Sequence, residues 1–232
     1  MLTTSDDVLP RLTIEFPAAA DYLSTILLIK RDYDAVHNTR LASRLGVSKP
    51  AVSQAVSRLK QIGLLEQDSY GVIELTGSGR AVAEKIIRRH YLIEHLLIRT
   101  VRYPWEKADA EALRLQTMIS DDLADHLHET FDRPSVCPHG NPFPGSEGEA
   151  ELLRAPRLVS CLPGTTAVIV RITEEGEAVD GLLRYCHAEG IQPGTELHIE
   201  AVVPETAVRV TAPDKKIVDI PWEIAVHICV SE

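Results

Sequence analysis

The stretch between Asn38 and Ile62 limits the possible folds of this chain more than any other segment. A short helix is predicted from about Asn38 to Leu45, and Gly46 ends it because glycine accepts the left-handed backbone of a tight turn. A second helix is predicted over Ser48–Ile62, with Ser48 as its N-cap and Pro50 in its first turn, where a helix needs no N–H. Two helices joined in this way are typical of a helix-turn-helix.

The outward face of the second predicted helix is polar and basic. Ser53 and Gln54 are short polar groups able to reach base edges, whereas Lys49 and Lys60 suit phosphates. We therefore expect this helix to lie in a major groove of double-stranded DNA. The candidate DNA-binding residues are Arg40, Ser48, Lys49, Pro50, Ser53, Gln54, Ser57, Arg58 and Lys60.

A wing is predicted directly after this helix, as two short strands over Leu64–Gln67 and Val72–Leu75. The whole chain has a net charge of −10, but local fields rather than net charge steer association with DNA. From Ala35 to Leu65 there is no acidic residue, and there are five basic ones. A solvated helix face is the alternative for this basic island, and the wing favours a winged helix-turn-helix.

Two long helices are predicted next, over Gly79–Tyr103 and Glu106–Phe131, and both have continuous apolar stripes. Together they have more apolar surface than a small winged domain can bury, which indicates an interface. A two-fold homodimer is the commonest oligomer and matches a palindromic operator. This part is therefore predicted to be a helical dimerisation domain.

The C-terminal part is predicted to be a small β-barrel with one helix over Val179–Ala188. Its expected strands are Ala167–Ile172, Glu196–Val203, Ala207–Thr211, Lys215–Ile220 and Ala225–Val230. The predicted fold class is mainly α with small β. Residues 1–77 would form the winged helix-turn-helix, 78–145 the helical dimerisation and metal-binding domain, 146–162 a linker, and 163–232 an SH3-like barrel.

Targeting and redox features predict a cytoplasmic protein. The longest apolar runs are far shorter than the roughly 20 residues of a membrane span. The N-terminus lacks the basic and apolar regions of a secretion signal, so no membrane partner is expected. The four cysteines, Cys137, Cys161, Cys186 and Cys229, form no CxxC pair, and we expect reduced thiols.

Two pairs of side chains are candidate metal ligands. His90 and Glu94 stand four residues apart on one helix face, so an imidazole and a carboxylate can share a divalent ion. Cys137 and His139 lie in a Pro/Gly-rich loop after the dimer helices. The alternatives are a hydrogen-bonded surface pair and a structural loop with a buried thiol. A mixed N, O and S set is compatible with Mn, Fe, Zn or Cd.

Several motifs occur in the order and spacing of one family. The run LASRLGVSKPAVSQAVSRLKQIGLL, followed by ELTGSGRAVAEKIIRRHYLIEHLL, MISDDLADHL and CPHGNPFPG, closely resembles the diphtheria toxin repressor family of metal-dependent regulators. The resemblance covers nearly the whole chain and implies a homodimer, a ferrous-transport-A-type C-terminal domain, and DNA contacts by Ser48, Pro50 and Gln54. The resemblance also implies metal ligands at His90, Glu94, Asp21 and Asp109. It implies a secondary site of Glu94, Cys137 and His139. A further donor, Glu175, would come from the barrel.

The sequence departs from the family at its primary sensing site. The matching positions hold Leu113, Gln116 and Thr117; leucine cannot bind a metal, and the other two are weak neutral ligands. One site around His90 and Glu94 is expected to survive. The residues that would complete it are Cys137 with His139, or Asp109 with an acid of the C-terminal domain.

The residues and the resemblance together predict a transcription regulator. As a repressor, it would use Mn²⁺ or Fe²⁺ as corepressor and control metal-homeostasis genes from a palindromic operator. The sequence shows no nucleophile–base motif, so no enzymatic activity is predicted. The alternative is a metal-independent winged-helix regulator with a decayed metal site, which Leu113, Gln116 and Thr117 favour.

Overall fold

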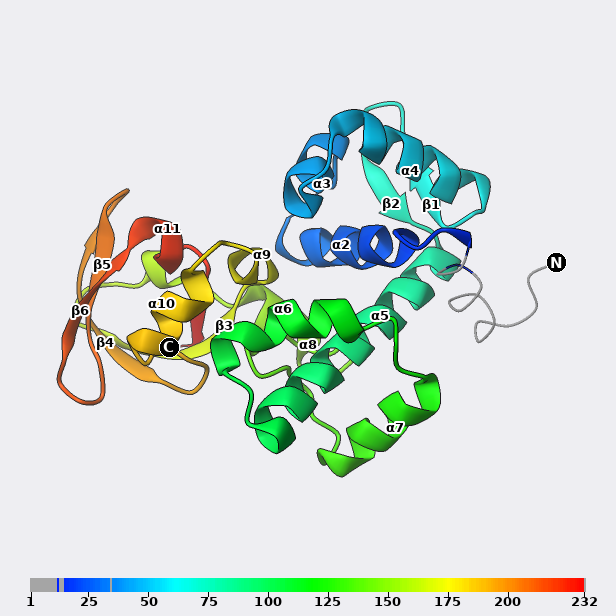
Figure 1. The fold of residues 1–232 in the computed structure, drawn as a ribbon. Coiled ribbons are helices and arrows are strands. Elements are labelled where there is room, and N and C mark those ends of the chain that lie inside the picture. The colour runs from blue at the N-terminus through cyan, green and yellow to red at the C-terminus, as the bar shows by residue number, and fades with distance from the viewer. Residues whose placement is uncertain (1–11, 13–14, 34, 232) are drawn as a thin grey trace. The chain divides into compact units, whose positions relative to one another are not determined.

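The computed structural model describes residues 12, 15–33 and 35–231. The chain forms two compact units (Figure 1): the first comprises the chain up to His90 with Leu115–Ala124, and the second comprises Tyr91–Arg114 with the chain from Asp125 onward. One helix, α5 (Gly77–His95), contributes to both units. The boundary therefore falls inside a continuous helix, next to the predicted metal ligands His90 and Glu94.

The first unit contains the predicted winged helix-turn-helix, which is confirmed. Gly46 ends the first helix of the motif with a φ of 65°, and the Ser48 hydroxyl caps the second by accepting a hydrogen bond from Ala51 N at 3.3 Å. Each strand of the wing is one residue shorter than predicted. The elements are α2 (Ala19–Asp32), α3 (Asn38–Leu45), α4 (Lys49–Gln61), β1 (Leu65–Gln67) and β2 (Ile73–Leu75), the two strands being antiparallel.

The core of this motif joins all three helices to the wing. Burial of one leucine or isoleucine side chain contributes about 1.5–3 kcal/mol, so this packing holds α4 firmly against α3. The opposite face of α4 stays in solvent. The core side chains, each at most 1% exposed, are Leu23, Ile26, Leu41, Val52, Leu59 and Ile73.

The helical middle of the chain has breaks that the prediction missed. α5 begins at Gly77 and passes after His95 into a wider π-helical turn, η1 (Leu96–Val101). The single predicted helix Glu106–Phe131 is wrong, because the chain forms two helices, α6 (Trp105–Leu115) and α7 (Asp121–Thr130). Ser120 starts the second of them, since its hydroxyl accepts a hydrogen bond from Leu123 N at 3.1 Å.

The C-terminal part of the second unit is a five-stranded antiparallel sheet in the order β6-β5-β4-β3-β7, which confirms the SH3-like fold class. Its core includes Ile169, Ile199, Val210 and Ile228, with Leu182 packed among them from α10 (Leu182–Ala188). The strands are β3 (Thr166–Ile172), β4 (Glu196–Val203), β5 (Ala207–Thr211), β6 (Ile217–Pro221) and β7 (Ile228–Ser231).

Short helices replace parts of the predicted barrel connections. The predicted helix Val179–Ala188 begins only at Leu182, because Gly181 precedes it with a φ of 79°, and a separate turn of helix, α9 (Glu174–Glu177), follows β3. The predicted strand Ala225–Val230 starts at Ile228, since α11 (Trp222–Ala225) takes its first residue. The predicted linker, 146–162, contains α8 (Glu149–Arg154) and η2 (Leu158–Ser160).

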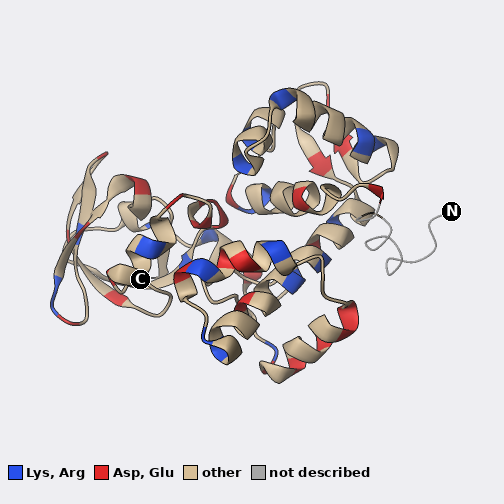
Figure 2. Ribbon diagram, in the orientation of Figure 1, with Lys and Arg blue, Asp and Glu red and all other residues tan. Residues whose placement is uncertain are grey.

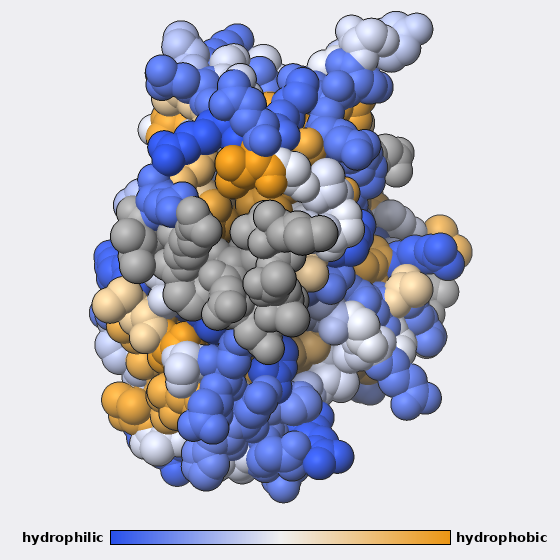
Figure 3. All heavy atoms as spheres, turned by 90° about the vertical axis from the view of Figure 1, so that its right-hand side faces the viewer, coloured by the Kyte–Doolittle hydropathy of each residue, from blue (hydrophilic) through white to orange (hydrophobic). Residues whose placement is uncertain are grey.

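The surface is mainly hydrophilic with separate hydrophobic patches, as one face shows in Figure 3. The helical middle contributes five of the exposed large apolar side chains, namely Val101, Leu113, Leu115, Met118 and Leu123. Single exposed apolar residues are ordinary, and these five divide between the two units, with Val101 and Leu113 in the second and the other three in the first. Among the described residues, no helix combines the length and the apolar character needed to cross a membrane.

Candidate metal centre

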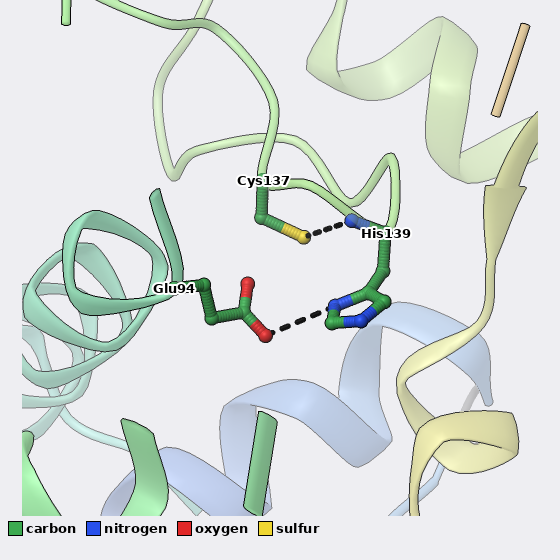
Figure 4. Close-up of side chains that lie close together, drawn as sticks. All are labelled: Glu94, Cys137 and His139. Atoms are coloured by element: carbon green, nitrogen blue, oxygen red, sulfur yellow. Dashed lines mark hydrogen bonds and ion pairs between the residues drawn. The ribbon is translucent and has the colours of Figure 1, made fainter. Parts of the chain in front are cut away.

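Three buried side chains of the second unit face one another (Figure 4): Glu94 near the end of α5, and Cys137 and His139 from the loop after α7. One ligand atom from each lies within 4.8 Å of the others. His139 Nδ1 is 3.0 Å from Glu94 Oε1, and the exposed fraction of both side chains is 0%. A carboxylate, a thiol and an imidazole at this spacing are the donor types of a divalent transition-metal site.

A tight turn places Cys137 and His139 on the same side of the loop. Cys137 N donates to Asn141 O at 2.8 Å, and Gly140 N donates to Cys137 O at 2.9 Å. The backbone N–H of His139 donates to Cys137 Sγ at 3.3 Å. We call residues 137–141 the ligand turn. Its internal hydrogen bonds fix the direction of both candidate ligands.

The His139 ring is held by Trp105 at the start of α6. The Trp105 carbonyl oxygen lies 3.2 Å from His139 Nε2 and accepts its hydrogen, while the Trp105 indole packs on the imidazole with ring centroids 4.5 Å apart. This contact directs Nδ1 at Glu94. Metal-binding histidines commonly donate their second ring N–H to a carbonyl or carboxylate in this way.

The barrel adds two buried carboxylates through α9. Glu177 Oε1 lies 3.6 Å from His139 Nδ1, and Glu174 accepts a short hydrogen bond from the Tyr91 hydroxyl. The expected barrel donor, Glu175, is half-buried, whereas Glu174 and Glu177 are buried. Thr173 explains this difference, because its hydroxyl caps α9 by accepting from Gly176 N at 3.0 Å, and helical spacing then places positions 174 and 177 on one face.

Burial and negative charge together set the protonation of the centre. Burial lowers the pKa of His139, but the Glu94 carboxylate, with help from Asp109 and the Trp105 carbonyl, outweighs burial, so the pKa is raised. Burial raises the pKa of Cys137 well above its ordinary value, and Glu94, Glu177 and Glu174 raise it further. Buried carboxylates are costly without a compensating cation. The donor set therefore fits a divalent ion, which would take the place of the protons.

The affinity of this centre for Mn²⁺ is expected to rise with pH. The pKa of His139 is raised and the pKa of Cys137 lies well above its ordinary value, and both groups must lose a proton to bind as imidazole and thiolate. Each displaced proton changes the apparent affinity by about tenfold per pH unit below the pKa of its group. Mn²⁺ titrations between about pH 6 and about pH 8 measure this slope. An affinity that does not change with pH would show that neither residue binds the ion.

The other predicted ligands, His90, Asp109 and Asp21, lie on three different helices. His90 stands one helical turn before Glu94 on α5. Asp109 of α6 has a carboxylate oxygen within 4.8 Å of a Glu94 oxygen, and its charge helps to raise the pKa of His139. Asp21 lies at the start of α2 in the first unit, where burial raises its pKa.

In the first unit the Gln116 amide occupies a position that matches a metal ligand of the family's primary sensing site. Gln116 Oε1 is 3.2 Å from His90 Nδ1, and Gln116 Nε2 donates to Asp21 Oδ1 at 3.5 Å. Leu113 is 53% exposed, and Thr117 is half-buried. Hydrogen bonds of the Gln116 amide thus link the imidazole and the carboxylate.

The predicted DNA-binding residues from Ser48 to Lys60 are all exposed on α4 or at its cap, and α3 and α4 contain basic but no acidic residues (Figure 2). Two arginines already have partners within the unit. Arg58 donates to Glu15 O at 2.7 Å and stacks on Phe16, and the Arg40 guanidinium lies 3.4 Å above the Tyr33 ring. Ser53 accepts from Asn38 at 3.1 Å and donates to Lys49 O, so Gln54 and the lysines are the more available groups.

A winged helix-turn-helix in one unit and a buried N, O and S donor cluster in the other define a DNA-binding protein of a metal-binding class. Comparison with family models agrees at each part of the chain. Residues 16–73 match the iron dependent repressor N-terminal DNA binding domain, 76–145 match the iron dependent repressor metal binding and dimerisation domain, and 157–232 match the FeoA domain. The chain therefore belongs to the iron-dependent repressor family, to which the diphtheria toxin repressor also belongs.

Individual relatives extend the likeness over most of the chain. The iron-dependent repressor IdeR of Mycobacterium tuberculosis is 33% identical over 215 residues, which cover 88% of this chain and 92% of the relative. A manganese-dependent transcriptional repressor solved with manganese superposes with a TM-score of 0.82 at 31% identity, covering 92% of this chain and 99% of that one. The crystal structure of T. acidophilum IdeR gives a TM-score of 0.74 at 32% identity, covering 91% and 96%.

Four residues at the centre, Tyr91, Trp105, Glu174 and Glu177, were not among the predicted site residues. Glu174 and Glu177 had a usable signal, because Thr173 is a good helix cap and acids three residues apart share a helical face. Trp105 and Tyr91 gave none, since their contacts depend on how α5, α6 and the ligand turn pack.

Proposed function

We propose that this protein is a metal-dependent transcriptional repressor whose sensing centre consists of Glu94, Cys137, His139 and Glu177. The observation that carries the proposal is the fully buried contact between Glu94 and His139, with the Cys137 thiol beside it. Mn²⁺ or Fe²⁺ is the proposed corepressor. A bound divalent ion would supply further positive charge to a centre that buried carboxylates line.

Control of DNA binding would run through α5, which belongs to both units. Glu94 holds the sensing end of this helix, and the winged helix-turn-helix precedes its other end. The ion acts only if it binds more tightly to the conformation that fits DNA. The exposed apolar residues of the helical middle would form a homodimer interface, which places two recognition helices on a palindromic operator.

The exposed residues of the recognition helix, α4, would have different roles in DNA binding. Gln54 would read base edges, because it is exposed and amides pair with adenine in the major groove. Lys49 and Lys60 would contact phosphates, which give affinity without sequence preference. Ser48, Pro50 and Ser57 are exposed as well, at the cap or on the helix.

We propose no catalytic role for this protein. As a DNA-binding repressor, it would act in the cytoplasm, where its DNA lies. A nucleophilic cysteine needs a lowered pKa, whereas the pKa of Cys137 is raised by burial and by three neighbouring carboxylates. We therefore assign this thiol to metal binding.

Metal removal tests the proposal directly. A labelled palindromic duplex, selected from a random library with Mn²⁺-loaded protein, is titrated with chelator-treated protein, with and without Mn²⁺ or Fe²⁺. Fluorescence anisotropy should show a metal-dependent gain in affinity of about 5–150-fold. Gln54→Ala is the control: it should weaken binding to the selected duplex while Mn²⁺ binding stays unchanged. Equal DNA affinity after stringent chelation would favour the metal-independent regulator, the reading supported by the Gln116 amide between His90 and Asp21.

A further inference from the structure

A buried polar chain runs from the barrel into the metal centre. Arg171 of β3 is fully buried, and its Nη1 donates to Asn141 Oδ1 at 2.7 Å. Asn141, also fully buried in the ligand turn, uses its Nδ2 group to donate to Glu177 Oε1 at 2.6 Å and to Ile172 O at 2.8 Å. These three side chains link a buried cation to a carboxylate that lies 3.6 Å from His139.

The orientation of the Asn141 amide is determined by its two charged neighbours. An amide has one oxygen that accepts and one NH₂ group that donates. A guanidinium only donates and an ionised carboxylate only accepts. The reversed amide would therefore set NH₂ against Arg171 and oxygen against Glu177, with repulsion at both ends. Arg171 thus determines that the NH₂ end of the Asn141 amide points to Glu177. The charge of Arg171 also polarises the amide, which strengthens the hydrogen bond to Glu177.

A neutral amide separates Glu177 from Arg171. A direct bidentate pair with an arginine would occupy both oxygens of a carboxylate. Here the amide donates to one oxygen, Oε1, and positive charge still reaches the carboxylate through the amide. The backbone of the same residue closes the ligand turn, because Asn141 O accepts from Cys137 N at 2.8 Å. One residue therefore holds both the turn that carries two ligands and the carboxylate that approaches from the barrel.

We infer that Asn141 and Arg171 are positioning residues that hold the Glu177 carboxylate in place as a metal ligand. The inference rests on the proposed metal centre and makes the barrel part of the sensor. Loss of an outer hydrogen-bond partner of a metal ligand typically lowers metal affinity by about 10–100-fold. Removal of Asn141 should therefore resemble removal of the Glu177 carboxylate.

Cobalt substitution of the full chain tests this inference, because Co²⁺ absorption reports thiolate ligation and coordination number separately. Wild type, Asn141→Ala, Glu177→Gln and the double variant are titrated with Co²⁺, and folding is checked by circular dichroism. Every variant should keep the thiolate charge-transfer band from Cys137. Asn141→Ala and Glu177→Gln should show the same change in the ligand-field bands and a loss of affinity of about 10–100-fold, and the double variant should lose no more than Glu177→Gln alone.

The outcomes separate the inference from the proposed function. Ligand-field bands of Asn141→Ala that match wild type, or losses that add in the double variant, would overturn the positioning role. A wild-type protein without a thiolate band would instead overturn the metal centre itself. If Asn141→Ala does not fold, Arg171→Met keeps the volume and the amide and should shift the same bands in the same direction. Gln192→Ala, which removes a barrel amide bonded to His187, is the control and should match wild type.

Discussion

Replacement of Glu94 by glutamine is expected to lower the affinity for Mn²⁺ by more than about 100-fold, beyond the loss that follows from an outer partner. Glu94 is the side chain that faces both residues of the ligand turn, with its carboxylate 3.0 Å from His139 Nδ1. Glutamine keeps the volume, so the packing around it is preserved, but it removes the negative charge that a cation requires. The charge of Glu94 is also the main effect that raises the pKa of His139, so that pKa should fall.

Isothermal titration with Mn²⁺ measures the first effect, and NMR titration of the His139 ring measures the second. Glu223→Gln is the matched control, because it neutralises an exposed acid of the barrel, in α11. Its affinity should stay close to wild type. Mn²⁺ binding that survives Glu94→Gln unchanged would place the sensing site elsewhere in the chain.

Gly140→Ala is expected to lower the free energy of unfolding by about 2–5 kcal/mol and to abolish stabilisation by metal. Gly140 has a φ of +91°, and a Cβ atom there would lie 2.1 Å from Val170 O and 2.7 Å from Arg171 Cα. These are backbone atoms of β3, so no side-chain rotation relieves the overlap. The ligand turn must therefore move away from the barrel, which separates Cys137 and His139 from Glu177.

Gly145→Ala isolates the steric part of this effect. Gly145 also has a positive φ, +76°, but an added Cβ would meet nothing within 4 Å. It should lose only about 1–2 kcal/mol and should keep the rise in stability that saturating Mn²⁺ produces. Urea unfolding of both variants, with and without Mn²⁺, measures the difference. Equal losses in the two variants would show that contact between the turn and β3 contributes nothing.

The helix-turn-helix was predictable because its signals are local. Gly46, Ser48 and Pro50 act through their own backbone and caps, so sequence alone shows where each helix ends and begins. The break between α6 and α7 was missed although its signal is equally local. Apolar spacing continues through Ile119 and Leu123, and it obscured the cap at Ser120 and the two acids that follow it.

The metal centre was only partly predictable. Cys137 and His139 share a turn, but their approach to Glu94 joins segments more than 40 residues apart, and the family resemblance rather than any local pattern pointed to it. Glu175 stays a prediction, whereas the cap at Thr173 places Glu174 and Glu177 on one face of α9, and Glu177 lies 3.6 Å from His139. Asn141 and Arg171 gave no signal, because an amide and an arginine gain their role only when β3 and the ligand turn pack together.

The raised pKa of His139 affects the state of the protein after a bound metal ion dissociates. The Glu94 carboxylate raises the pKa of His139, so a proton on this ring and a metal ion are alternatives that both bring positive charge next to Glu94. Small zinc domains unfold without their ion, because the binding free energy of the ion supplies their folding free energy. Here the departing ion would exchange for protons from water. The same molecule would thus be emptied and refilled many times, and repression would end without destruction of the repressor.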